Sequence, residues 1–83
     1  MHEYHLAESV LKSILAKTKE MPNIKKITSI RITLGNLKMV SKETFSQTFK
    51  LVAAKSICAD AKLDIKEVMG DTLLIEDIEG EYE

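Results

Sequence analysis

The first five residues hold both histidines of the chain, together with Glu3 and the α-amino group of Met1. An amine, the next amide nitrogen and the imidazole of a histidine at position two can bind one metal ion through fused chelate rings. Nitrogen donors in one plane suit Cu(II) or Ni(II) better than Mg²⁺ or Ca²⁺. This start therefore predicts a metal site, whose candidate ligands are Met1, His2, Glu3 and His5. The competing interpretation is a solvated N-terminus that carries no metal.

The rest of the sequence shows no pattern typical of catalysis. It contains no phosphate-binding loop, no dinucleotide-binding glycine pattern and no nucleophile-elbow motif. A chain of 83 residues can form one small core, which leaves little room for an enclosed active site. The one cysteine, Cys58, excludes a disulfide within the chain and a zinc site built from several cysteines. We therefore predict that the protein is not an enzyme, and that Cys58 is a small buried apolar residue.

Composition indicates one globular domain, because 45% of the residues are hydrophobic and 30% are charged. No apolar run is long enough for a membrane-spanning helix, and the first residues lack the basic and apolar regions of a signal peptide. These features predict a cytoplasmic protein without a membrane partner. Basic residues are scattered and aromatic residues make up 5% of the chain, which argues against nucleic-acid binding.

Charge is unevenly distributed, although the net charge is −1. Residues 71–83 contain no Lys or Arg, so all 12 basic residues lie in residues 1–70. The acidic residues of the last segment are Asp71, Glu76, Asp77, Glu79, Glu81 and Glu83. This pattern is typical either of a solvated acidic edge strand or of a docking surface for a basic partner, and the sequence leaves both open.

Two segments have the apolar spacing of amphipathic helices. The first spans about residues 5–20 and ends before Pro22, which disfavours helical geometry at the preceding residue. The second spans about residues 42–55 and begins after Ser41, a good N-cap residue. Their apolar faces consist of Leu6, Val10, Leu11, Ile14, Leu15, Phe45, Phe49, Val52 and Ala53.

Three further segments alternate between apolar and polar residues, as strands do: about residues 24–34, 62–68 and 73–78. A short turn at Gly70-Asp71 separates the last two, so we expect them to pair as a β-hairpin. The order α-β-α-β-β predicts an α/β chain of the two-layer α+β type. In this fold two helices pack on one face of a small mixed β-sheet.

Several motifs occur together in one order. The chain starts with Met-His-Glu, and residues 30–37 form a strand that ends in Leu-Gly-Asn-Leu. The other matching segments are residues 6–11, 40–49, 61–68 and 73–79. Together they resemble the HypA/HybF family of hydrogenase and urease nickel-incorporation proteins, over nearly the whole chain.

The resemblance implies a nickel metallochaperone, which delivers Ni(II) to the large subunit of [NiFe]-hydrogenase together with a maturation GTPase of the HypB type. It also implies the nickel ligands, which are the Met1 amine, the amide and imidazole of His2, and Glu3. His5 lies outside the family's basic motif and is either an additional ligand or a bystander. The alternative is a HypA-like interaction module that docks a maturation partner without handling metal.

One region departs from the family pattern. Family members carry a zinc domain with two Cys-x-x-Cys pairs between their last two strands, whereas residues 69–72 are Met-Gly-Asp-Thr. We therefore expect no zinc, and a single nickel-binding-type domain over residues 1–83 from which the insert is absent. An open sheet edge in such a small domain can pair with a second copy, so a homodimer is a further expectation.

Overall fold

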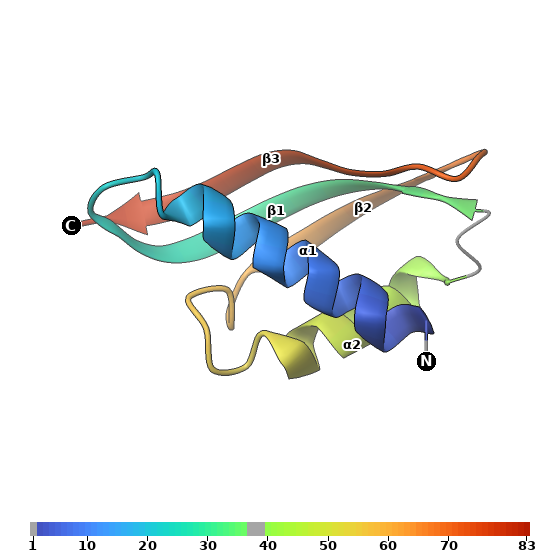
Figure 1. Cartoon of the computed structure of the whole chain (residues 1–83), viewed down its shortest axis with the longest axis horizontal. Helices are drawn as coiled ribbons and strands as arrows, with labels where there is room; N and C mark the ends of the chain where they lie inside the picture. The colour runs from blue at the N-terminus through green and yellow to red at the C-terminus, as the bar shows by residue number, and fades with distance from the viewer. Residues whose placement is uncertain (1, 37–39) are drawn as a thin grey trace.

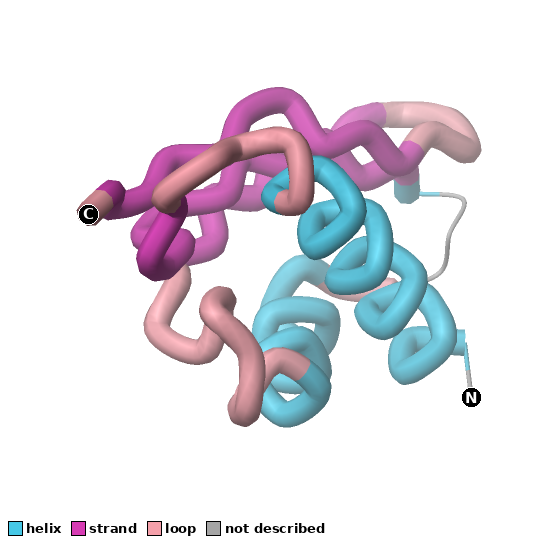
Figure 2. The backbone as a smooth tube through the Cα atoms, turned by 60° about the vertical axis from the view of Figure 1, so that its left-hand side comes forward, coloured by secondary structure: helices cyan, strands magenta, loops and turns pink. Residues whose placement is uncertain are grey.

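The computed structural model describes residues 2–36 and 40–83, with all of their side chains except those of His2 and Glu3. The described residues form two helices and three strands. Their order is α1 (His2–Thr18), β1 (Ile24–Gly35), α2 (Lys42–Val52), β2 (Lys62–Val68) and β3 (Leu73–Tyr82). Both helices lie on one side of the strands (Figures 1 and 2). The predicted two-layer α+β fold is confirmed.

Helix α1 buries Ala7, Val10 and Ile14, which recur at helical spacing on one face. It begins at His2 rather than at about residue 5, and it ends at Thr18 rather than at about residue 20. The Thr18 hydroxyl donates to the Leu15 carbonyl oxygen at 2.8 Å within the last turn. The chain then turns into β1 through Asn23, whose φ of 70° lies in the left-handed region that asparagine tolerates.

Helix α2 starts as predicted. The Thr44 N–H donates to the Ser41 hydroxyl oxygen at 3.1 Å, which satisfies one amide group of the first turn. Phe45 and Phe49 are fully buried, and their rings stack with centroids 6.2 Å apart. The helix ends at Val52, three residues short of the expected end. The N–H of the C-cap residue Ala53 donates to the Phe49 carbonyl oxygen and completes the last helical turn. The chain then folds into tight turns, so the helix does not continue.

The strand order in the sheet is β2-β1-β3, which corrects the predicted β-hairpin. β1 lies between the other two strands, parallel to β2 and antiparallel to β3. The parallel pair requires a crossover connection, which α2 provides. Residues 69–72 then pass across the end of β1. Two strand spacings amount to about 10 Å, a distance that four residues span without difficulty.

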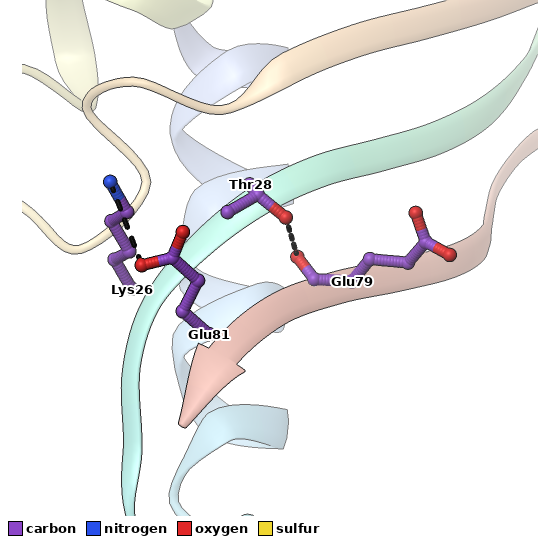
Figure 3. Close-up of polar contacts among 4 residues, drawn as sticks. All are labelled: Lys26, Thr28, Glu79 and Glu81. Atoms are coloured by element: carbon purple, nitrogen blue, oxygen red, sulfur yellow. Dashed lines mark hydrogen bonds and ion pairs between the residues drawn. The ribbon is translucent and has the colours of Figure 1, made fainter. Parts of the chain in front are cut away.

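β3 is an edge strand of the sheet, and its acidic residues are exposed. Some of them pair with β1: Glu81 lies 3.8 Å from Lys26, and the Thr28 hydroxyl donates to the Glu79 carbonyl oxygen at 3.2 Å (Figure 3). These contacts carry the strand to Tyr82, beyond the predicted end at Ile78. The acidic segment is therefore an exposed edge strand, and its role as a docking surface for a basic partner stays an open prediction.

The core lies between the helix layer and the inner face of the sheet. Apolar side chains from both helices and from β1 fill it, and the 53–61 segment after α2 closes one end. Its buried members are Ala7, Val10, Leu11, Ile14, Ile27, Ile30, Ile32, Val40, Phe45, Phe49, Ala53, Cys58 and Ala61. This packing fixes the direction of α1, and hence the place of the backbone at its first residues, His2 and Glu3.

Candidate metal centre

The predicted metal ligands lie at the start of α1. The backbones of His2, Glu3 and His5 belong to its first turns, whereas Met1 and the side chains of His2 and Glu3 lie outside the described residues. The His5 ring is exposed and meets the ring of Tyr4 edge-on, with centroids 6.4 Å apart. The structure therefore does not test the ligand set, and it places His5 on the surface of α1.

The fold assembles no other metal centre from the residues that it describes. Within residues 2–36 and 40–83, apart from the side chains of His2 and Glu3, no group of three or more His, Cys, Asp or Glu side chains could hold a metal ion. The N-terminal chelate needs no such assembly, because its donors are neighbours along the chain. The candidate site is therefore local to residues 1–3, with His5 one helical turn away from His2.

The helical backbone at His2 matters for metal chemistry. The first four N–H groups of an α-helix have no acceptor within the helix. The amide nitrogen of His2 can thus become a ligand without breaking a helical hydrogen bond. The positive end of the helix dipole opposes a bound cation, but it favours a deprotonated amide and a carboxylate such as that of Glu3.

Packing of α1 against α2 holds this end of the molecule in place. Val10 and Ile14 of α1 belong to the same buried cluster as Phe45 and Phe49 of α2. The two helices begin at the same end of the molecule (Figure 1). The backbone of His2, Glu3 and His5 therefore belongs to a helix whose later turns are packed in the core.

Cys58 is buried, as predicted, and its side chain is 2% exposed. Burial raises the pKa of the Cys58 thiol above its ordinary value, and a hydrogen bond with Ser56 acts in the opposite direction. Metals bind the thiolate rather than the thiol. A neutral, buried thiol is a poor ligand, so Cys58 belongs to the core rather than to a metal site.

The outer face of the sheet carries a shallow hollow of about 550 Å³ that sequence reasoning did not predict. Arg31, Asp64, Lys66 and Glu76 line it, so it presents charges of both signs. The Thr33 hydroxyl donates to the Glu76 carboxylate at 2.8 Å inside it. These residues come from three strands whose order the sequence does not reveal, and for that reason the sequence carried no signal for the hollow.

Comparison with known proteins identifies the class. The family model for hydrogenase/urease nickel incorporation, metallochaperone, HypA matches residues 1–73. A hydrogenase maturation factor HypA from Francisella philomiragia is 38% identical over 65 residues, which are 78% of this chain and 56% of that protein. Its namesake from Methanococcus vannielii is 33% identical over 72 residues, 82% of this chain and 58% of that protein. The chain therefore belongs to the HypA family.

A solved structure supports the fold. The solution structure of the Ni metallochaperone HypA from Helicobacter pylori aligns over the whole of both chains, with a TM-score of 0.76 and 19% sequence identity. At that identity the likeness concerns the fold alone. The chain spans little more than half the length of the curated relatives named above.

The family assignment and the structure each bear on an earlier expectation. The family is described by nickel incorporation and metallochaperone activity rather than by catalysis, in agreement with the prediction that the chain is not an enzyme. Among the described residues no helix is both long enough and apolar enough to cross a membrane.

Proposed function

We propose that the protein binds Ni(II) through the Met1 amine, the amide and imidazole of His2, and Glu3, and that it passes the metal on during maturation of a [NiFe]-hydrogenase. The observation that carries the proposal is the family match, which begins at Met1 and so includes the Met-His-Glu start. The position of His2 in the first turn of α1 supports it, because the His2 amide is not needed by the helix.

Delivery requires that the metal can leave. Ligands at a chain terminus can be replaced one at a time by those of an acceptor, whereas a site closed in the core would have to unfold first. The proposed acceptor is the large subunit of the hydrogenase, and a GTPase of the HypB type is the proposed partner in delivery. The buried, unpaired Cys58 fits a reducing compartment, and the proposal places the protein in the cytoplasm.

Calorimetric titration of Ni(II) into protein that starts at Met1 tests the proposed site. The matched variants are His2→Ala and a chain extended by one glycine before Met1, which moves the free amine away from His2. We expect near-stoichiometric binding by the native protein and loss of that binding in both variants. Retention of binding by both variants, or no binding by the native protein, would refute the site.

His5 is tested in the same experiment. If His5 is an additional ligand, His5→Ala should weaken nickel binding while leaving its stoichiometry unchanged, and if it is a bystander the titration should match that of the native protein. A complex with a maturation partner that forms without metal and survives His2→Ala would favour the alternative, a docking module that handles no metal.

The proposal includes a single domain without zinc. Residues 69–72 connect β2 directly to β3, and none of them is a cysteine. Metal analysis of the purified protein checks this part. A stoichiometric amount of zinc that resists a chelator would contradict it.

A further inference from the structure

β3 has a free edge along a regular stretch of its backbone. The strand lies at one side of the sheet, so one side of it has no strand partner within residues 2–36 and 40–83. In the register with β1, Glu76 is an extra residue on β3, whereas residues 77–82 all have partners on β1. An unpaired edge is a template for a further strand. Residues 77–82 are therefore the part of β3 that can best pair with a strand from another molecule.

The two faces of this segment differ in character. Asp77, Glu79 and Glu81 are exposed and share one face of the strand, since side chains alternate along it. Ile78 is half-buried on the other face, where it packs against the core. Tyr82 alternates with the acidic residues and is 58% exposed. A strand added at this edge would thus meet carboxylates on one face and apolar side chains on the other.

A hollow of about 190 Å³ lies on the apolar side of this edge, between β3 and the end of α1. Its apolar lining consists of Ile75, Ile78 and Met21, and its charged lining consists of Lys17, Glu76 and Asp77. Helix α1 approaches α2 more closely than it approaches β3. The helix layer therefore leaves room beside β3 for apolar side chains of a partner.

The carboxylates on the outer face can still bind cations. Glu81 lies 3.8 Å from Lys26 and Asp77 lies 3.9 Å from Arg31, and exposed ion pairs of this kind contribute little to stability. Among the residues that the structure describes, none forms an ion pair with the Glu79 carboxylate. The Glu79 side chain points away from the Lys26–Glu81 pair (Figure 3). The middle of this acidic face is therefore open to a basic side chain.

We propose that residues 77–82 of β3 bind an extended segment of a partner protein that alternates basic and apolar residues, and that this segment pairs with β3 as a fourth strand. Its basic side chains lie beside Asp77, Glu79 and Glu81, and its apolar side chains lie beside Ile78 and Tyr82. Main-chain hydrogen bonds along the edge supply affinity, and the side chains supply specificity. The proposal does not depend on nickel binding.

The chain's own strands do not have this pattern. Pairing of β3 with its own copy would bring carboxylates together, and like charges directly opposite each other are destabilising. On the exposed face of β2, Asp64 stands between Lys62 and Lys66, so pairing with β3 would place a carboxylate against the acidic face. The charges of this edge therefore disfavour a second copy of the chain and favour a basic partner.

The peptide acetyl-Lys-Val-Lys-Val-Lys-Val-Lys-amide is a probe with the required pattern. We propose to follow its binding by ¹H–¹⁵N NMR of the full chain in metal-free buffer. We expect shift changes concentrated in residues 77–82 and slower hydrogen exchange of amides on the free side of β3. The paired surface is small, so the dissociation constant should be on the order of 100 µM. A peptide with serine in place of each valine should bind roughly tenfold more weakly, because it buries no apolar side chain.

Charge variants test the place of binding. Glu79→Lys should weaken binding of the lysine-valine peptide about fivefold, because an attractive cross-strand pair becomes repulsive. Glu79→Gln, which only removes the charge, should weaken it less. Glu67→Lys is the matched control, since it makes the same charge change at an exposed position of β2, the opposite edge of the sheet. Circular dichroism of each variant confirms that it folds.

Three results would overturn the proposal. The first is the absence of shift changes in residues 77–82 at about 1 mM peptide, a concentration well above the expected constant. The second is equal binding of the serine peptide, which would show attraction by charge alone. The third is equal weakening by Glu67→Lys and Glu79→Lys, which would show a dependence on net charge rather than on β3. These results are independent of the nickel site, because every titration is done without metal.

Discussion

The backbone N–H of Gly35 donates to the carbonyl oxygen of Thr72 at 2.6 Å, at the point where the 69–72 connection passes across the end of β1. Close by, the Gly70 N–H donates to the side-chain oxygen of Asn36 at 3.1 Å. A Cβ atom at residue 35 would overlap the Gly70 carbonyl oxygen and lie 2.5 Å from the Thr72 nitrogen. The short connection can close over β1 because residue 35 has no side chain.

Gly35→Ala should therefore destabilise the protein. The atoms that the new methyl group meets belong to the backbone and cannot move aside cheaply, so we expect a loss of about 1–3 kcal/mol in the free energy of unfolding. Urea denaturation measures it. Two glycines inserted between Gly70 and Asp71 should recover most of the loss by relaxing the connection. Equal stability of Gly35→Ala and the native protein would contradict this account of the crossing.

Ser41→Ala removes the side-chain cap of α2. The Thr44 N–H loses its acceptor, and we expect the free energy of unfolding to fall by about 1 kcal/mol. Ser41→Asp is the control, because its carboxylate can accept the same hydrogen bond and is favourable at a helix N-terminus. Thermal denaturation of the three proteins would show the native protein and Ser41→Asp close together. A similar loss in both variants would argue against capping.

Because of Cys58, we expect the free energy of unfolding to change with pH in the alkaline range. Burial raises the pKa of the Cys58 thiol in the folded protein above its ordinary value of 9.0. At a pH near 9 the unfolded chain therefore begins to lose the thiol proton, while the folded protein still keeps it. Below that value the effect vanishes, and above it stability falls as pH rises. Replacing Cys58 with Ala removes the group. We expect urea denaturation at pH 7 and pH 10 to give a smaller difference for Cys58→Ala than for the native protein, and an equal difference would contradict the effect.

Nickel binding should weaken in mild acid. An α-amine has a pKa of about 7.7–8.0 and an imidazole one of about 6.5 in the absence of perturbation, and the metal must displace protons from the ligands. We expect the apparent affinity for Ni(II) to fall steeply between pH 8 and pH 6. Calorimetry across this range measures the fall. An affinity that does not change with pH would exclude the amine and the imidazole as ligands.

Local sequence patterns predicted the elements well where side chains alone decide them. β2 spans the predicted residues 62–68, and α2 begins directly after the predicted cap, Ser41. β3 runs on to Tyr82 because β1 is long enough to pair with Glu79 and Glu81. That extension depends on a partner strand and not on the alternation within β3 itself.

Strand order is where local reasoning was wrong. The short turn after Val68 is typical of a hairpin, yet β1 separates β2 from β3. A pattern of alternation shows which face of a strand is buried, but it does not show which strand lies beside it. The crossover through α2 places β2 parallel to β1 and leaves the other side of β1 free for β3.

The candidate nickel site and the hollow on the outer face of the sheet differ in whether the sequence could predict them. The chelate at Met1, His2 and Glu3 could be proposed from the sequence because its donors are adjacent along the chain, and no folding is needed to bring them together. The hollow joins Thr33 to Glu76, which are distant in the sequence. The sequence by itself determined the elements and the helix cap, and it is the source of the N-terminal ligand set, which stays a prediction. The tertiary structure decided the strand order, the acidic edge and the open edge of β2. Pairing and exposure depend on which segments the core brings side by side.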